Sequence, residues 1–519
     1  MVSYASEVGV DLCVLGSGVS GMLVAERALA RGRNVLVIER GTPMSFSDRR
    51  RQGSHDDPLS FNRTKHANPM AGGGEYVARP VYNLGGSTNH FYGNMPRIHP
   101  RHFQEEIFHG VDRTWPITYS EIEPYYLEAE RRLLISGNSS RIPFSGQFDY
   151  PLPPHRLSPY DRACEQIYGQ EHVMQVPTVR PPTEVESRPR CCGTNLCGLC
   201  PIDSKGTALN TVYPSLREKI EFRTGLLVTE LECTNGRVEA VTAIDEAGDL
   251  HRIEARQFVV ACNGIDSCLL LQRSAGVPKH PSLGRYYMDH PAFDIVVYGT
   301  DLEAKPGYGD SAQTGMMTLF FERVADDLPI SLLGEIKCGE LSKDEGNENR
   351  DHVVRDIFQL STKGRFSEAH DLRSRFQEIW QGAVYLRFLV EMLPLPENTL
   401  SVKSIADSGQ AFPDISVRYP DYMDSCIDRV MSDLQTRLPS AQVKFLSRSP
   451  SVQHWLGATR MADSPEDGCV DRNLRYFGLE NLFILSASSY SSGSSANPTD
   501  TLAALALRLG DHLADARHA

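Results

Sequence analysis

The chain has 519 residues, of which 40% are hydrophobic and 23% are charged, as expected for a globular protein of two or three domains. A formal net charge of −13 argues against nucleic acid and anionic membranes as partners. No apolar run approaches the length of a membrane span, and the first residues lack the basic and apolar regions of a secretory signal. We therefore expect a cytoplasmic protein without a membrane span.

The first segment with a clear signature has the spacing G-x-G-x-x-G, formed by Gly16, Gly18 and Gly21. An apolar run precedes it, a helical run at 22–31 follows, and a second apolar run at 35–38 ends at Glu39. This order of strand, tight turn, helix, strand and acidic residue is the fingerprint of a dinucleotide-binding fold. The helix N-terminus favours the phosphates, and Glu39 can accept hydrogen bonds from ribose hydroxyls. The fingerprint alone does not distinguish NAD from FAD.

The next 150 residues are less regular. Residues 45–74 are polar without an apolar period, so we expect a long loop over the cofactor. A glycine-rich turn follows at 83–93, and an amphipathic helix is predicted with Ser120 as its N-cap. Residues 144–190 are rich in proline, which predicts an irregular excursion.

Alternating patterns dominate the middle of the chain. Short strands separated by Asn-Gly and Ala-Gly turns are expected over 221–255. A strand into a glycine turn at 257–264 and a helix at 267–274 indicate a return to the nucleotide-binding domain. From 292 to 450 we expect a separate sheet that roofs an active site, with strands at 293–298 and 383–390.

The last seventy residues carry the second strong signature, in the segments His454–Met461, Gly468–Ser488 and Ala496–Arg508. Together with the N-terminal fingerprint, they resemble the glucose–methanol–choline (GMC) oxidoreductase family. The resemblance also includes the segments Gly85–Thr88, Trp115–Tyr119 and Gly284–Pro291. The region from about 300 to 440 carries no motif of the family.

The resemblance implies an α/β protein, α+β overall, with a Rossmann-type FAD-binding domain and a substrate domain. The substrate domain is expected to have a largely antiparallel sheet with helices, as in the GMC and p-hydroxybenzoate hydroxylase-like architecture. The implied FAD-binding domain is discontinuous and comprises residues 1–100, 200–291 and 450–519. The implied substrate domain comprises residues 101–199 and 292–449.

The family also implies oxidation of an alcohol by hydride transfer to flavin N5. Its base falls on His454 in the H-x-x-G-[TA]-x-x-M motif, and its second catalytic position falls on Asn497. A neutral imidazole is suited to take a hydroxyl proton at neutral pH, and an amide can orient the substrate oxygen without titrating. The structural alternatives are a buried core histidine at 454 and a cap at Asn497 for the helix that starts near Pro498.

The residues expected to contact FAD are Gly16, Ser17, Gly18, Gly21, Glu39, Arg40, Gly86, Ser87, His90, Val228, Ala261, Ala487, Asn497, Pro498 and Thr499. The Asn-Pro-Thr setting is similar to the pyranose oxidase branch and its bacterial relatives. In pyranose oxidase, a histidine four residues after the second glycine of the turn is bonded to the flavin 8α-methyl. That position here is His90, so a covalent link and a simple flavin contact are both open.

Four cysteines, Cys191, Cys192, Cys197 and Cys200, lie within ten residues. The spacing C-x-x-C-P is of the type used by iron–sulfur and zinc sites. The segment also resembles the cysteine run of bacterial FAD glucose dehydrogenases, which implies an iron–sulfur cluster, although the last gap is one residue shorter here. A disulfide between Cys192 and Cys197 and free thiols are the other readings, and spacing alone does not decide among them.

The leading hypothesis is therefore an FAD-dependent oxidoreductase that acts on a hydroxyl of a sugar, aminosugar, aminoglycoside or polyol. Oxygen or another electron acceptor would reoxidise the flavin, and a bound cluster would favour the second. The alternatives are an FAD-retaining lyase of the same family, an electron-transferring dehydrogenase subunit with an iron–sulfur cluster, and an NAD-dependent Rossmann dehydrogenase. The C-terminal motifs disfavour the last of these.

Overall fold

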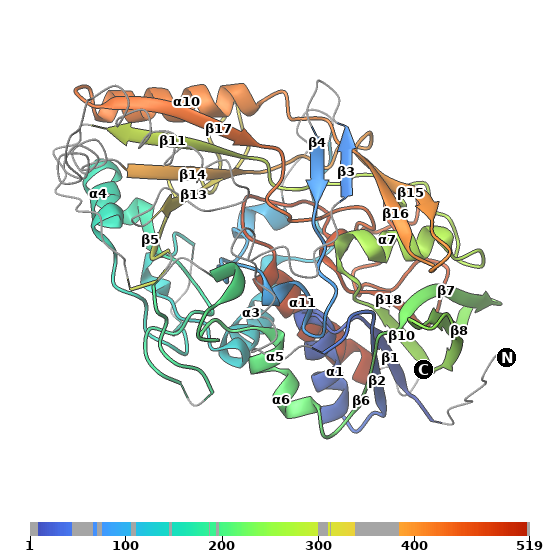
Figure 1. The fold of residues 1–519 in the computed structure, drawn as a ribbon. Helices are drawn as coiled ribbons and strands as arrows, with labels where there is room; N and C mark the ends of the chain where they lie inside the picture. The colour runs from blue at the N-terminus through green and yellow to red at the C-terminus, as the bar shows by residue number, and fades with distance from the viewer. Residues whose placement is uncertain are drawn as a thin grey trace, which may run out of the picture.

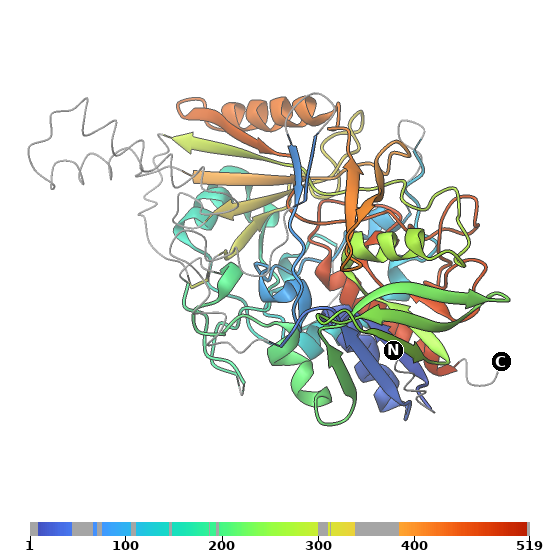
Figure 2. The same ribbon diagram turned by 45° about the vertical axis from the view of Figure 1, so that its right-hand side comes forward.

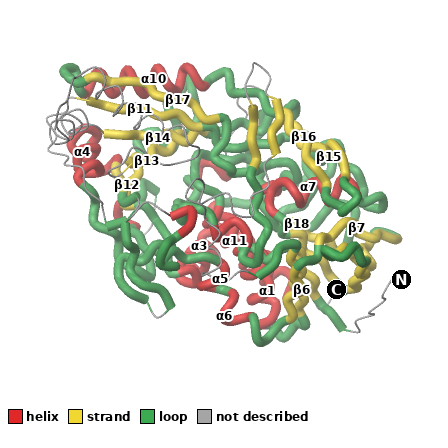
Figure 3. The backbone as a smooth tube through the Cα atoms, viewed as in Figure 1, coloured by secondary structure: helices red, strands yellow, loops and turns green. Residues whose placement is uncertain are grey.

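A computed structural model describes residues 9–43, 66–69, 75–104, 111–144, 148–185, 187–193, 197–298, 310–311, 313–337 and 384–515. Two main sheets organise this structure (Figure 1). One is parallel and holds the chain's N-terminal strand, and the other is antiparallel and lies at the opposite end of the molecule. The predicted mixed α/β class is confirmed, with extensive loops between the elements (Figure 3).

The parallel sheet has the strand order β18-β10-β1-β2-β6. Its strands are β1 (Leu12–Leu15), β2 (Val35–Glu39), β6 (Glu221–Thr224), β10 (Gln257–Val260) and β18 (Leu482–Ile484). The residues of β1 and β2 are almost entirely buried, as expected for a parallel sheet covered on both faces. The helices around this half are α1 (Val19–Ala30), α3 (Tyr119–Leu133), α7 (Asn263–Arg273) and α11 (Thr499–Asp515). The predicted strand–turn–helix–strand unit at the N-terminus is therefore present.

A three-stranded antiparallel sheet accounts for the alternating pattern after residue 221. It comprises β7 (Leu227–Thr234), β8 (Arg237–Ile244) and β9 (Leu250–Glu254). The turn between β7 and β8 places Asn235 at φ 49° and Gly236 at φ 77°. Both residues have the positive φ that a tight Asn-Gly hairpin turn requires, so the predicted hairpin is confirmed.

The second large sheet is antiparallel, with the order β17-β11-β14-β13-β12-β5. Its strands are β5 (Val173–Gln175), β11 (Ala292–Tyr298), β12 (Gly315–Met317), β13 (Leu332–Lys337), β14 (Val384–Val390) and β17 (Gln442–Ser449). One face packs on α4 (Pro159–Tyr168) and on α10 (Met423–Arg437), which lies along the sheet in Figures 1 and 2. The other face is turned toward the parallel sheet, as the roof predicted over 292–450 requires.

The remaining elements are short. The helices are α5 (Ala208–Thr211) and α6 (Tyr213–Leu216), and the strands are β3 (His66–Pro69), β4 (Glu75–Ala78), β15 (Thr399–Ile405) and β16 (Ala411–Ser416). Single 3-10 turns occur at Gly86–Asn89, Pro100–Phe103, Ser139–Arg141, Gln170–His172, Cys197–Leu199 and Ala487–Ser489.

Three local predictions are wrong. The expected loop over 45–74 contains β3, which pairs with β4, and most of its other residues lie outside the described part. The N-cap of α3 is Thr118, which forms a capping box with Glu121, and Ser120 lies inside the helix. The excursion at 144–190 contains α4 and β5.

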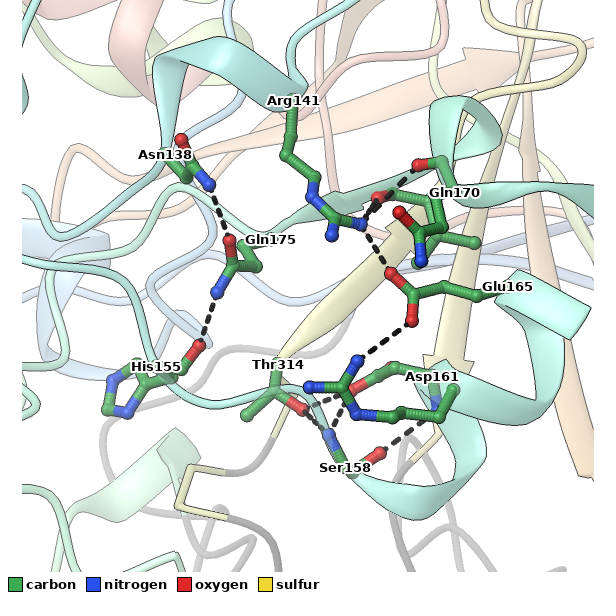
Figure 4. Close-up of polar contacts among 11 residues, drawn as sticks. Asn138, Arg141, His155, Ser158, Asp161, Glu165, Gln170, Gln175 and Thr314 are labelled. Atoms are coloured by element: carbon green, nitrogen blue, oxygen red, sulfur yellow. Dashed lines mark hydrogen bonds and ion pairs between the residues drawn. The ribbon is translucent and has the colours of Figure 1, made fainter.

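Side-chain hydrogen bonds connect α4 and β5 to neighbouring segments of the chain (Figure 4). Ser158 and Asp161 form the capping box of α4, and the Thr314 hydroxyl also donates to the Asp161 carboxylate. The amide of Gln175 accepts a hydrogen bond from Asn138 at 2.8 Å and donates to the His155 carbonyl at 2.8 Å. These side-chain bonds hold a proline-rich segment in regular structure.

Candidate active site

A cavity of about 370 Å³ lies between the two large sheets. Leu15, Ile38 and Ala261 line it at the carboxyl ends of β1, β2 and β10, where open α/β sheets bind their ligands. Of the residues predicted to hold FAD, those that line the cavity are Gly16, Ser17, Gly18, Glu39, Arg40, Gly86, Ser87, His90, Val228, Ala261, Ala487, Asn497, Pro498 and Thr499. Gly21 does not line it.

The three glycines of the fingerprint differ in their surroundings. Gly16 has φ 108°, and a Cβ there would lie 2.4 Å from the Ala261 carbonyl oxygen. A Cβ on Gly21 would lie 2.1 Å from the Gly16 carbonyl oxygen, so Gly21 is required for the packing of α1 on β1. A Cβ on Gly18 would meet no protein atom within 4 Å, so Gly18 faces open space.

The start of α1 fits a negatively charged ligand. Gly18 is its N-cap and supplies no side-chain hydrogen bond to the first-turn N–H groups. Val19 and Ser20 of this first turn line the cavity. Free N–H groups together with the helix dipole favour phosphate at this position, so the site fits the pyrophosphate of FAD.

Glu39 is buried at the end of β2. Its Oε2 accepts hydrogen bonds from the Ser17 N–H at 3.0 Å and the Ser17 hydroxyl at 2.6 Å, and its Oε1 accepts one from the Gly41 N–H at 2.7 Å. Burial raises the pKa of Glu39, and these hydrogen bonds act in the opposite direction. A carboxylate offers about four acceptor positions, so Oε1 retains one for a ribose hydroxyl.

The second glycine-rich turn packs directly on the first. A Cβ on Gly86 would lie 3.0 Å from the Gly18 Cα, and the Gly85 N–H donates to the Ser17 hydroxyl at 3.1 Å. The turn carries His90, which is 4% exposed and lines the cavity. The two motifs therefore form one wall of the cavity although they are 70 residues apart in the chain.

The imidazole of His454 lies against that of His290. Their Nδ1 atoms are 2.8 Å apart, and the ring planes meet at 84°. His454 lines the cavity, whereas His290 is fully buried and does not. Burial lowers the pKa of His454 well below its usual range, helped by His290, and burial lowers the pKa of His290 to about 4. Both rings are neutral at neutral pH, the state in which an imidazole accepts a proton.

Asp289 joins the two histidines through their backbones. Its Oδ1 accepts hydrogen bonds from the N–H groups of His290 at 2.7 Å and His454 at 2.9 Å. Its Oδ2 accepts from the hydroxyls of Tyr76 at 2.6 Å and Ser451 at 2.5 Å. Burial raises the pKa of Asp289, and these donors oppose the rise. The buried carboxyl group is thus fully satisfied, and it holds the chain around His454 in place.

Asn497 lines the cavity, and its Oδ1 is buried without a hydrogen-bond partner among the described residues. The Leu502 N–H bonds to the Pro498 carbonyl at 3.0 Å, so Pro498 is the N-cap of α11 and Asn497 precedes the helix. The predicted capping role is therefore not seen. A buried amide oxygen without a partner is costly, which points to a ligand that binds there.

The antiparallel sheet presents polar side chains to the cavity. In the strand register, Arg387 of β14 stands directly opposite Asp294 of β11 and Glu335 of β13. Nε and Nη2 of Arg387 donate to the Asp294 carboxylate at 2.9 and 3.1 Å. Asn94 Nδ2 donates to Glu335 Oε1 at 3.2 Å and to Gln313 Oε1 at 2.9 Å. These charged and amide groups form a polar roof opposite the glycine-rich wall.

The cysteine segment lies beside the turn that carries His90. Lys205 Nζ donates to the carbonyls of Cys197 at 2.8 Å, Phe91 at 2.6 Å and Asn89 at 3.3 Å. Cys191, Cys197 and Cys200 carry free thiols. Within the described residues, no group of three or more His, Cys, Asp or Glu side chains is arranged to hold a metal ion.

Sequence reasoning missed two kinds of residue around this cavity. Asp289 and His290 belong to the recognised segment 284–291, but nothing local in that segment assigns them to His454. Most polar residues of the roof come from the region without a recognisable motif, and Asn94 directly follows the glycine-rich turn at 83–93. The roof residues are Asn94, Gln313, Glu335 and Arg387.

Comparison with known proteins gives a consistent picture. Residues 175–292 and 424–506 match two family profiles described as GMC oxidoreductase. The chain is 26% identical to the fructose dehydrogenase large subunit of Gluconobacter japonicus, with 96% of this chain and 97% of that protein aligned. It is 27% identical to 6'''-hydroxyparomomycin C oxidase of Streptomyces lividus, with 98% and 93% aligned.

The fold also matches a solved structure. Pyridoxine 4-oxidase from Mesorbium loti superposes with a TM-score of 0.66 at 17% identity, over 97% of this chain and 98% of that one. Among the described helices, none has the length and apolar character needed to cross a bilayer.

Proposed function

The chain belongs to the GMC oxidoreductase family, and on that basis we propose that it oxidises a hydroxyl of a sugar, aminosugar, aminoglycoside or polyol to the carbonyl. It is an FAD-dependent oxidoreductase, and we assign the role of base to His454. The observation that carries the proposal is that the glycine-rich cradle and the side chains of His454 and Asn497 line one cavity.

The residues at the two ends of this cavity have separate tasks. Gly18 and the first turn of α1 would hold the pyrophosphate, and Glu39 the ribose. When bound, FAD supplies the acceptor for the hydride of the carbinol carbon. His454 takes the hydroxyl proton at Nε2, because its Nδ1 is engaged by His290. The amide of Asn497 holds a substrate oxygen without changing its own charge.

The polar side chains of the roof are suited to bind a substrate with several hydroxyl groups. Glu335 lines the cavity with a carboxylate that can accept hydrogen bonds, and Arg387 beside it donates to Asp294. Such a carboxylate favours hydroxyl groups and an ammonium group, as an aminosugar carries. Replacing Glu335 by Gln should raise KM for an amine-bearing sugar by about tenfold, the value of one charge-assisted hydrogen bond. KM for the matching neutral sugar should change little, and equal effects on both would contradict this role.

The reaction class is tested by anaerobic bleaching of the flavin across sugars, polyols and aminoglycosides. Loss of the yellow colour with a member of this panel supports the oxidoreductase. A flavin that stays oxidised during turnover would support the lyase alternative. A colourless protein would exclude both and leave the NAD-dependent alternative.

The attachment of FAD is a separate question. His90 lies on the wall beside Gly86, which supports contact with the flavin. Acid precipitation distinguishes a covalent link from a simple contact. Yellow colour that stays in the pellet of the wild-type enzyme, but moves to the supernatant in His90→Ala, would establish the covalent link. Yellow colour in the supernatant of the wild-type enzyme would exclude it.

A cluster-bearing dehydrogenase is the second candidate. The sulfurs of the described cysteines do not fit a metal centre. Arg188, however, lies near Asp203 and Cys200, is 2% exposed, and has Nε and Nη2 without partners in the described structure. Such a buried cation is stabilised by thiolate charge nearby. Iron and acid-labile sulfide in freshly purified enzyme would establish the cluster, and their absence would remove it. The acceptor, oxygen or another, and the cytoplasmic location stay predictions.

A further inference from the structure

We infer that His290 is a positioning residue that keeps the proton of His454 on Nδ1 and so leaves the lone pair of His454 Nε2 for the cavity. The inference rests on the proposed function, because it concerns how the base of that reaction is held in its reactive form.

The geometry of the pair limits the choices to two. A neutral imidazole carries one N–H donor and one acceptor nitrogen. Since the Nδ1 atoms of His290 and His454 are 2.8 Å apart, one must donate and the other must accept. If His290 donates, His454 carries its proton on Nε2, and that nitrogen has no lone pair to take a proton from a substrate hydroxyl. If His454 donates, its Nε2 is the acceptor and can act as the base.

The surroundings of His290 select the second arrangement. The ring is fully buried, and the backbone of Gly493 and Ser494 favours a proton on it. A Cβ built on Gly493 would lie 3.4 Å from His290 Nε2, so this stretch of backbone borders Nε2. A proton on that nitrogen leaves Nδ1 of His290 as an acceptor. His290 Nε2 is itself buried without a hydrogen-bond partner in the described structure, whereas His454 lines the cavity and its Nε2 is not engaged by His290.

Asp289 makes the arrangement rigid. One oxygen, Oδ1, receives the backbone N–H groups of both His290 and His454. The two backbone segments that carry the rings therefore cannot move apart without breaking a buried hydrogen bond. The pair differs from a Ser-His-Asp triad in that the orienting group is a neutral imidazole, which fixes the tautomer without adding a charge.

The direct test is the tautomer of His454 in the FAD-loaded wild-type enzyme. Histidine nitrogen NMR at neutral pH distinguishes a protonated from an unprotonated ring nitrogen, and the spectrum of His454→Gln assigns the signals. We expect Nδ1 of His454 to be protonated and Nε2 to be bare. A proton on Nε2 in the resting enzyme would overturn the inference.

Two substitutions of similar size provide a second test. His290→Gln retains an oxygen that can accept the Nδ1–H of His454, whereas His290→Leu has no acceptor. Flavin reduction in the Leu variant should slow by about tenfold to a hundredfold with little change in KM, since the base is present but no longer held in one orientation. The Gln variant should recover most of that loss.

His454→Ala distinguishes failure of this inference from failure of the proposed function. If His454→Ala abolishes flavin reduction while His290→Leu reduces at the wild-type rate, the reaction stands and the role of His290 is refuted. If His454→Ala has no effect, the proposed function itself loses its base. Equal losses in the Gln and Leu variants would mean that His290 serves packing alone.

Discussion

Replacing Asp289 by Ala tests whether one buried carboxyl group positions the base. The change leaves the backbone N–H groups of His290 and His454 without an acceptor, and neither group can turn to another partner. The longer contact from the Val452 N–H, at 3.3 Å, is lost as well. The hydroxyls of Tyr76 and Ser451 also lose their acceptor, but they can rotate. A buried donor without a partner costs about 1–3 kcal/mol, so the two N–H groups together cost about 2–6 kcal/mol. We expect a large fall in the thermal midpoint.

The rate of flavin reduction should fall as well. A displacement of the His454 backbone by about 1 Å is enough to slow a positioned reaction by about 10²-fold. Asp289→Asn is the matched control, because it keeps an oxygen where Oδ1 accepts both N–H groups. The assays are thermal unfolding followed by flavin fluorescence and anaerobic stopped-flow reduction. An Ala variant with wild-type midpoint and rate would refute the reasoning, as would an Asn variant that is as damaged as the Ala variant.

Three further predictions concern the cradle and the reacting groups. Gly18→Ala should fold, because its Cβ meets no protein atom, but it should bind less FAD, because the Cβ enters the open space of the cavity. Gly21→Ala should fail to fold, because its Cβ would lie 2.1 Å from a backbone oxygen. The FAD content of the purified protein tests the first variant, and the yield of folded protein tests the second. Burial lowers the pKa of His454, so the base stays neutral as pH falls and flavin reduction should hold its rate below pH 6.5, where an unperturbed histidine becomes protonated. Asn497→Ala should slow flavin reduction by about tenfold, the value of one hydrogen bond.

Local patterns predicted the elements whose form depends on neighbours in the chain. The unit from β1 to Glu39 follows from an apolar run, the glycine spacing and a helical run, and all three lie within 30 residues. The hairpin of β7 and β8 follows from an Asn-Gly turn between alternating strands. The side chain of His454 could be selected because its motif is continuous in sequence.

Elements that depend on distant partners could not be predicted. Residues 66–69, with the sequence His-Ala-Asn-Pro, show no apolar alternation. They form a strand because they pair with β4 and because the Asn68 side chain accepts the Ile415 N–H at 3.2 Å. Helix α4 was hidden by proline, yet Pro159 occupies its first turn, where proline is compatible with a helix. The contact between His290 and His454 joins residues 164 positions apart, and no spacing in the chain reports it.

The central claim is that His454 takes the hydroxyl proton, and the rate of flavin reduction in His454→Ala at saturating substrate tests it most directly. The variant should keep its FAD and slow by about 10²–10⁴-fold, the usual contribution of a positioned base. A variant that retains FAD and reduces it at the wild-type rate would contradict the claim.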